Sequence, residues 1–175
     1  MSKVGAGIDR PKTPPTRKVN RLNYDYSRNG AYFITICSKD KAHIFGTVEA
    51  STEHSSVGAG IDRPKTNLTK IGIKVEEGVL GISQKYKIIS VDKYVIMPNH
   101  VHMIITIDNF GRSMPAPTVS NIIAQLKSWV VKQLGILIWQ KGFYDHVIRG
   151  WEDYENIWTY IDTNPDKWSE DKYYV

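Results

Sequence analysis

The sequence has almost no cysteine and no long apolar run. Its one cysteine, Cys37, excludes an internal disulfide and is typical of a protein in a reducing compartment. No apolar stretch approaches the roughly 20 residues that cross a bilayer, and the N-terminus lacks the apolar centre of a signal peptide. We therefore expect a soluble, cytoplasmic protein without a membrane partner. Cys37 lies in an apolar run, which predicts a buried strand residue rather than a reactive thiol.

The composition fits one domain with a single apolar core, since 41% of the 175 residues are hydrophobic. The net charge of +5 favours a polyanionic partner only weakly. Ten Tyr and five Trp beside 23 Lys and Arg would suit a surface that stacks bases and neutralises phosphates. Half or more of these rings would be core residues under the simpler interpretation, so composition alone does not identify a nucleic-acid-binding protein.

One segment occurs twice, because residues 4–13 and 57–66 both read VGAGIDRPKT. Neither copy has an apolar period and both contain Gly and Pro, so neither is expected in a packed core. Two copies are also too few for a solenoid. These features predict a disordered tail over residues 1–19 and a folded domain over residues 20–175. They also predict that the domain carries an exposed inserted loop at about residues 50–67.

The identity of the two copies suggests a recent duplication of DNA. Codons for Gly-Ala-Gly are rich in G, and codons for the Arg-Pro that follows closely can be rich in C. We therefore hypothesise that each copy is a translated palindromic repeat element inside the gene. The gene sequence tests this hypothesis, which fails if the two stretches cannot form hairpins. The alternative is a duplicated linker without consequence.

Apolar spacing predicts both strands and helices. Runs rich in β-branched and aromatic residues predict strands at residues 31–37, 87–97 and 101–107. Helical spacing predicts helices at residues 67–81, 119–130 and 152–163. Pro98-Asn99 predicts a turn between the second and third strands, and Pro165 ends the last helix. Strands separated by helices indicate an α+β fold in which helices cover an antiparallel sheet.

His100 and His102 alternate with Val101 on the third predicted strand. Side chains alternate along a strand, so both imidazoles should leave one face while Val101 points into the core. Two neutral imidazoles on one face suit a divalent metal ion. Two surface histidines are the more common outcome, but the apolar residues on either side make this polar pair costly unless it has a use.

Tyr160 and Asn164 lie four residues apart and would share one face of the last predicted helix. A tyrosine hydroxyl with the ordinary pKa of about 10 is a weak nucleophile. It becomes useful against a phosphodiester if a metal polarises the phosphate, and Asn164 would add an oxygen ligand to that metal. Taken by themselves, the residues favour a simpler role for Tyr160 as a core aromatic.

Four segments resemble a known family. They are residues 20–37 (NRLNYDYSRNGAYFITIC), 94–107 (YVIMPNHVHMIITI), 139–149 (WQKGFYDHVIR) and 160–168 (YIDTNPDKW). In this order and at this spacing, they are similar to blocks of the REP-associated tyrosine transposases. This family is related to the single-strand insertion-sequence transposases and belongs to the HUH endonuclease superfamily. The likeness covers residues 20–168 except for the inserted repeat.

The resemblance implies a ferredoxin-like fold, with His100 and His102 as metal ligands and Tyr160 as the nucleophile. It also aligns Asn164 with a polar residue that lies near the metal in members of the family. The implied cofactor is Mg²⁺ or Mn²⁺, and two imidazole ligands suit Mn²⁺ as well. The implied activity is cleavage of single-stranded or hairpin DNA, with palindromic repeats as the expected substrate. Cleavage would form a covalent 5′-phosphotyrosine and free a 3′-hydroxyl that can rejoin strands. The resemblance leaves open whether the active unit is a monomer or a homodimer.

Several alternatives remain at this point. Tyr144 competes with Tyr160 as the nucleophile. DNA contacts are expected of a set of basic residues, Arg21, Lys127, His146 and Arg149, although His146 and Arg149 would fit a structural role equally well. A catalytically inactive DNA-binding protein of the same fold and a hydrolase using metal-bound water are the competing functions. The inserted repeat departs from the family and would inactivate this copy if it disturbed packing.

Overall fold

The computed structural model describes residues 29–49, 66–108 and 117–174. The main elements are strands β1 (Gly30–Cys37), β2 (Gly46–Val48), β3 (Thr66–Leu68), β4 (Ile89–Ile96), β5 (His100–Ile107) and β6 (Tyr144–Val147), and helices α1 (Lys70–Lys85), α2 (Val119–Leu134) and α3 (Gly150–Asp162). Two short 3-10 helices, η1 (Lys39–Lys41) and η2 (Pro165–Glu170), complete them. The predicted tail, Arg21, the first repeat and all of the second repeat except Thr66 lie outside the described residues.

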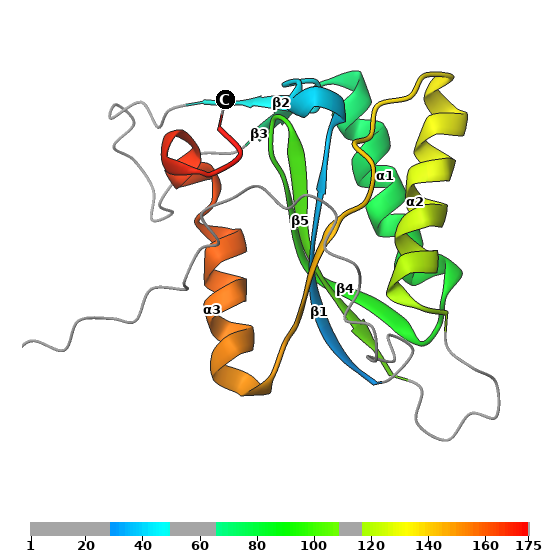
Figure 1. Ribbon diagram of the computed structural model, residues 1–175, viewed down its shortest axis with the longest axis vertical. Helices are drawn as coiled ribbons and strands as arrows, with labels where there is room; N and C mark the ends of the chain where they lie inside the picture. Colours follow the sequence, from blue (N-terminus) through cyan, green and yellow to red (C-terminus); the bar gives the residue numbers. More distant parts are fainter. Residues whose placement is uncertain (1–28, 50–65, 109–116, 175) are drawn as a thin grey trace, which may run out of the picture.

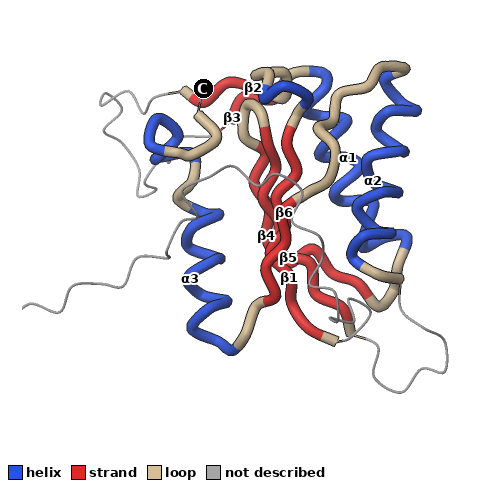
Figure 2. The backbone as a smooth tube through the Cα atoms, in the orientation of Figure 1, coloured by secondary structure: helices blue, strands red, loops and turns tan. Residues whose placement is uncertain are grey.

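Four strands form one antiparallel sheet in the order β4-β5-β1-β6. Along the chain these strands alternate with helices as β1-α1-β4-β5-α2-β6, the connectivity of a ferredoxin-like fold. Helices α1 and α2 pack beside each other on one face of the sheet, and α3 lies on the other (Figures 1 and 2). The α+β prediction, with an antiparallel sheet covered by helices, is therefore confirmed.

The central strand β5 is buried on both faces, and its alternation separates two apolar clusters. Val101, Met103 and Ile105 belong to the larger cluster, which they form with α1 and α2. Ile104 belongs to the smaller cluster beneath α3, with Phe33 and Ile157. Because Val101 faces the larger core, the two histidines beside it must leave the sheet on the α3 side. This alternation confirms the prediction for Val101.

Side-chain caps define where the two packed helices begin. The Thr69 hydroxyl accepts a hydrogen bond from the Gly72 amide at 3.1 Å, and Thr118 caps α2 in the same way at 3.2 Å from Asn121. Helix α1 consequently starts at Lys70, three residues later than predicted, and continues to Lys85. It runs past Gly78 and Gly81 because Val75, Val79 and Ile82 keep one buried face.

Three short strands were not predicted. Strand β6 adds an edge to the sheet beside β1, through the pairs Tyr32–Val147 to Thr35–Tyr144. Strands β2 and β3 pair with each other on either side of the predicted inserted loop. The last two residues of that loop, Thr66 and Asn67, belong to β3, and Thr66 pairs with Val48. Val48 and Thr66 are therefore direct neighbours in space, although 17 residues separate them in the sequence.

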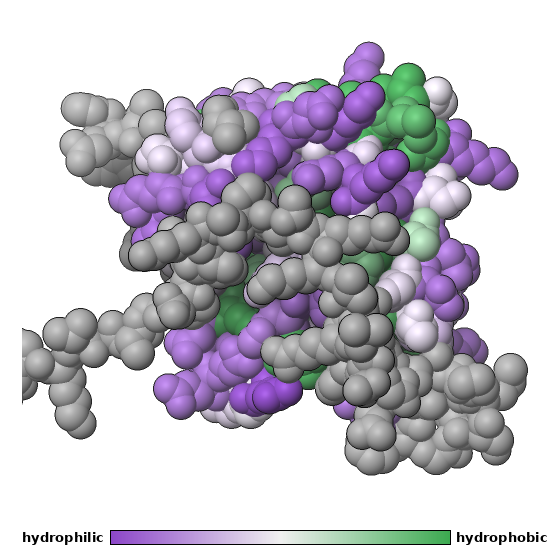
Figure 3. All heavy atoms as spheres, in the orientation of Figure 1, coloured by the Kyte–Doolittle hydropathy of each residue, from purple (hydrophilic) through white to green (hydrophobic). Residues whose placement is uncertain are grey.

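On the face drawn in Figure 3, the coloured surface is largely polar, and apolar residues gather near the end of α2 (upper right). The large exposed apolar side chains in this part of the chain are Trp129, Ile136 and Leu137, and Leu137 is 80% exposed. Among the described residues, no helix has the length and apolar character needed to span a bilayer. Exposed apolar groups of this size are common on proteins and carry no assignment by themselves.

Candidate active site

The histidine pair lies at the start of β5, directly after a tight turn. The turn is closed by a hydrogen bond from the Met97 amide to the His100 carbonyl at 2.8 Å. His100 and His102 are both fully buried, and their ring centroids are 4.4 Å apart. The prediction that both imidazoles leave one face of a strand is confirmed, and the pair is buried rather than on the surface.

Neighbouring oxygens orient each imidazole through its Nδ1 atom. Nδ1 of His100 lies 2.9 Å from Oδ1 of Asn99, whose amide nitrogen donates to the backbone carbonyls of Tyr173 at 2.7 Å and Lys41 at 3.2 Å. Nδ1 of His102 lies 2.8 Å from the Thr35 hydroxyl. Each ring keeps its Nε2 atom for another partner, which is how second partners orient metal-binding histidines.

Asp171 completes a group that could hold a metal ion. Ligand atoms of His100, His102 and Asp171 all lie within 4.8 Å of one another, and all three residues are buried. Nε2 of His100 has no hydrogen-bond partner among the described residues, although it is buried. An orphaned buried nitrogen beside a carboxylate is costly unless it meets a ligand. Two imidazoles and one carboxylate therefore fit a divalent metal ion.

Burial also keeps both imidazoles in the form that binds metals. Desolvation lowers the pKa of His100 to about 3, and it lowers the pKa of His102 well below the ordinary value. A nearby positive charge, Lys172, lowers both pKa values further, while Asp171 partly offsets the shift at His100. Both rings are therefore neutral at pH 7 and need not lose a proton to become ligands.

Tyr160 reaches this group from α3. Its hydroxyl lies 3.3 Å from Nε2 of His102 and donates to Oδ2 of Asp171 at 3.2 Å. Its ring packs edge-on against Phe33, at a centroid distance of 6.0 Å. The side chain is thus anchored in the smaller apolar cluster while its hydroxyl faces the histidines. The residue is partly a core aromatic and partly a polar contact of the candidate metal group.

Asn164 lies beyond the end of α3 but still joins the site. The helix ends at Asp162, yet Asn164 keeps helical backbone angles (φ −61°, ψ −40°). Its amide nitrogen donates to Oδ2 of Asp171 at 2.8 Å. The amide oxygen is buried without a partner among the described residues, so it remains available as a further oxygen ligand. The predicted neighbourhood of Tyr160 and Asn164 is therefore present, with Asp171 between them.

Asp171 is the residue that the sequence analysis missed. It follows η2, which begins at Pro165 and turns the chain back toward the sheet. Its Oδ1 atom accepts a hydrogen bond from the Tyr173 amide at 2.7 Å, which holds the carboxylate in place. In the sequence, Asp171 is one of two adjacent acids, Glu170 and Asp171, in a short polar and aromatic segment, and no spacing rule connects it to the distant histidines.

The other predicted residues have structural contacts away from the histidine pair. Lys127 donates to the carbonyls of Gln140 at 2.9 Å and Gly142 at 2.5 Å, and burial lowers its pKa to about 8. Nε2 of His146 lies 2.9 Å from the carboxylate of Asp153, as the structural alternative would have it.

Two further predicted residues lie near α3. Arg149 immediately precedes this helix, and its exposed backbone amide donates to Asp153 at 2.8 Å. Tyr144, the competing nucleophile, packs its ring against Phe33 at a centroid distance of 6.3 Å. Cys37 is half-buried, and desolvation raises the pKa of its thiol to about 11, in keeping with an unreactive thiol.

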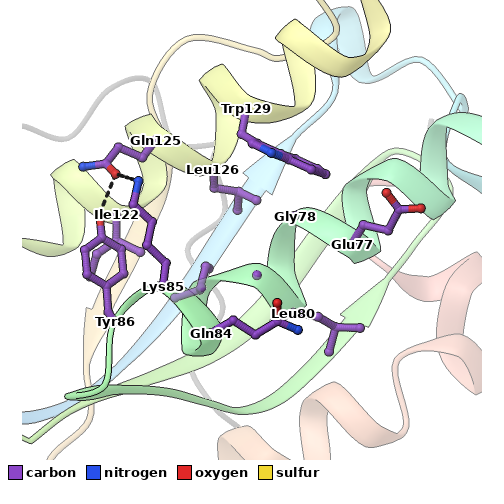
Figure 4. A pocket seen from close by; sticks show the side chains of 12 residues that line it. Glu77, Gly78, Leu80, Gln84, Lys85, Tyr86, Ile122, Gln125, Leu126 and Trp129 are labelled. Atoms are coloured by element: carbon purple, nitrogen blue, oxygen red, sulfur yellow. Dashed lines mark hydrogen bonds between the residues drawn. The ribbon is translucent and has the colours of Figure 1, made fainter.

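A groove between α1 and α2 lies apart from this site, on the other helical layer of the sheet. Its volume is about 630 Å³, and its lining residues include Leu80, Lys85, Ile122 and Trp129. Figure 4 shows Lys85 and Tyr86 directed at Gln125 across the groove, where both side chains bond its amide oxygen. The groove holds no group of metal ligands and does not contribute to the histidine site.

The chain is similar to a protein known by its sequence and to solved structures. No protein-family model matches the chain. An uncharacterized protein of Haemophilus influenzae is 29% identical over 195 residues, a match that covers 99% of this chain and 98% of that protein. A candidate transposase of Deinococcus radiodurans is more distant, with a TM-score of 0.45 and 12% identity over 84% of this chain and 97% of that one.

The structure of a REP-associated tyrosine transposase bound to a REP hairpin is similar with a TM-score of 0.58 and 20% identity. That match covers 90% of this chain and 76% of the transposase chain. With 90% of this chain covered, the likeness extends well beyond one motif. This chain therefore has the fold of a REP-associated tyrosine transposase, in agreement with the resemblance of its sequence blocks.

Proposed function

We propose that this protein is a metal-dependent DNA strand transferase in which Tyr160 attacks single-stranded or hairpin DNA. The observation that carries the proposal is the position of the Tyr160 hydroxyl, 3.3 Å from Nε2 of His102 and 3.2 Å from Asp171. A nucleophile, two neutral imidazoles and a carboxylate thus share one buried site. The shared fold with a transposase bound to a REP hairpin supports hairpin DNA as the substrate to test.

The residues that would hold Mg²⁺ or Mn²⁺ are His100, His102 and Asp171, with the amide oxygen of Asn164 as a further candidate. Such an ion would supply Lewis-acid polarisation of the phosphate and offset its developing charge. The protein's own contribution is orientation: Asn99 and Thr35 fix the two rings, and Asn164 fixes the Asp171 carboxylate.

The chemical step is a transesterification. The Tyr160 oxygen forms a bond to phosphorus, the bond from phosphorus to the 3′-oxygen breaks, and the hydroxyl proton passes to solvent while the 3′-oxygen gains one. The 5′-phosphate remains on Tyr160, so the energy of the phosphodiester is kept. A 3′-hydroxyl can then reverse the step and join strands. No external energy source is required, because one phosphodiester replaces another.

A covalent-adduct assay tests the proposal. The protein is incubated with a labelled hairpin oligonucleotide and Mn²⁺, denatured, and resolved by electrophoresis. We expect an adduct with the native chain, none with Tyr160→Phe, and an undiminished adduct with Tyr144→Phe as the matched control. The reverse pattern would make Tyr144 the nucleophile. Cleavage without an adduct would indicate a metal hydrolase, and binding without cleavage an inactive DNA-binding protein.

A further inference from the structure

The chain after η2 brings three consecutive side chains to the site. Asp171 bonds Tyr160, and Tyr173 is buried with its ring 4.5 Å from the His100 ring and 5.7 Å from the His102 ring. Lys172 lies between them in sequence and is half-buried. Its Nζ atom is 4.9 Å from the centroid of the Tyr173 ring and 5.3 Å from that of the Tyr144 ring. The ammonium is thereby held between two aromatic rings at the border of the site.

Strand register relates this ammonium to the histidines. Thr35 on β1 pairs with His102 on one side and with Tyr144 on the other. Directly paired residues share a face of the sheet, so His102, Thr35 and Tyr144 form one row facing α3. Lys172 lies over the end of this row and Tyr160 over its beginning, since the Tyr160 ring is 5.2 Å from the His102 ring. A candidate nucleophile and an ammonium group therefore lie at the two ends of this row.

We propose that Lys172 binds a non-bridging oxygen of the phosphate that Tyr160 attacks, an assignment that rests on the proposed function. A phosphodiester has two such oxygens and one negative charge, and attack concentrates charge on both. If one divalent ion held by His100 and His102 offsets the charge on one non-bridging oxygen, a second cation is needed for the other. A lysine ammonium is a compact point charge suited to that role.

Electrostatics within the site agree with this geometry. The Lys172 charge lowers the pKa of both His100 and His102, so its field reaches both imidazoles. Lys41 also lies over the Tyr173 ring, at 5.8 Å, and its charge lowers the pKa of His100 as well. Of these two lysines, Lys172 is the one that also lies over the Tyr144 ring, at the end of the row that contains His102. Lys41→Gln is a matched control, because it removes the same charge from beside the same Tyr173 ring.

The test compares Lys172→Gln, Lys172→Arg and Lys41→Gln by adduct rate and by Mn²⁺ affinity. We expect Lys172→Gln to slow adduct formation by about 10-fold to 100-fold, Lys172→Arg to recover part of the rate, and Lys41→Gln to lose less than about threefold. We expect Lys172→Gln to bind Mn²⁺ as tightly as the native chain or more tightly, since a repelling charge is gone. A variant that loses Mn²⁺ affinity together with the adduct would overturn the inference and make Lys172 structural.

A second measurement separates this inference from the proposed function. In a Tyr160→Phe background, single-strand oligonucleotide affinity is measured with Mn²⁺ at several salt concentrations. Lys172→Gln should weaken binding and reduce the slope of log affinity against log salt by about 0.7, the value for one phosphate contact. If the native chain forms no adduct but this change is seen, the strand-transfer proposal fails and Lys172 still binds phosphate. If adducts form and Lys172→Gln behaves as the native chain in both assays, only the inference fails.

Discussion

At the scale of single residues, the candidate site depends on which oxygen or nitrogen each buried side chain faces. Asn99 contacts Nδ1 of His100, and Thr35 contacts Nδ1 of His102. The Nε2 atom of each ring is thereby left for another partner. Asp171 receives hydrogen bonds from Tyr160, Asn164 and the Tyr173 amide. A single carboxylate therefore connects the candidate nucleophile to the candidate metal group.

The relative roles of Asp171 and Asn164 can be separated by substitution. Asp171→Asn removes the only carboxylate of the described metal-binding group and should lower Mn²⁺ affinity by at least about tenfold, as loss of a charged ligand does. Asn164→Ala should cost less, because Asn164 also acts by holding Asp171 in place. Isothermal titration with Mn²⁺ measures both. If Asn164→Ala costs more than Asp171→Asn, Asn164 rather than Asp171 is the third ligand.

The sequence predicted the two histidines because the period of a strand is a local property of three residues. It predicted Tyr160 and Asn164 through a family resemblance, since helical spacing alone favoured a core aromatic. Asp171 and Lys172 gave no signal, because their meaning depends on where η2 returns the chain. Lys127 and His146 were candidates for DNA contacts by charge, but the structure engages both in contacts within the protein.

At the scale of elements, the position of α1 is determined by a close backbone approach. An added Cβ at Gly72 would lie 1.9 Å from the Phe45 carbonyl oxygen, in the loop before β2. The same carbonyl accepts the Thr69 amide at 2.9 Å. The first turn of α1 is therefore docked directly on the backbone beside Phe45, and only glycine leaves room for it.

Two alanine substitutions in α1 should consequently have opposite signs. Gly72→Ala must displace either the helix or Phe45 and should reduce the free energy of unfolding by roughly 2–3 kcal/mol or more. Gly81→Ala meets no atom within 4 Å and should stabilise the protein by about 0.5–1 kcal/mol through helix propensity. Urea unfolding measures both. Equal effects of the two variants would contradict the docked first turn.

At the scale of the whole molecule, burial of the histidine pair couples the site to folding. Both imidazoles have pKa values below the ordinary value in the folded chain, so the unfolded chain binds more protons below pH 6.5. This contribution to stability is fully present above pH 6.5 and is lost as the pH falls toward the folded pKa of His100, about 3. The site therefore makes folding sensitive to acid before most carboxylates titrate.

We expect the free energy of unfolding to fall by roughly 2–3 kcal/mol between pH 7.5 and pH 5.5, about 1.4 kcal/mol for each histidine. The measurement is urea unfolding at both pH values in metal-free buffer. A variant with His100→Gln and His102→Gln should have a distinctly flatter profile over the same interval. An equally steep profile in that variant would assign the acid sensitivity to other groups.

Strands β2 and β3 bring the chain on the two sides of residues 49–65 to one point of the molecule. Val48 and Thr66 are paired neighbours in β2 and β3, so a two-residue turn is long enough to connect them. Replacing residues 49–65 by Asn-Gly should preserve the fold and the adduct, with a gain on the order of 1 kcal/mol from shorter loop closure. Thermal unfolding and the adduct assay test this. Loss of folding would mean that the segment is an integral part of the domain.

The sequence by itself determined the three long strands of the sheet and the three helices, because their apolar periods are local and repeat over several turns or pleats. It also determined the histidine pair, whose shared face follows from strand alternation alone. Only the tertiary structure decided that β6 closes the sheet, that Asn99 and Thr35 orient the imidazoles, and that Asp171 and Lys172 join them. Those residues come together through contacts between distant segments, and such contacts leave no period in the chain.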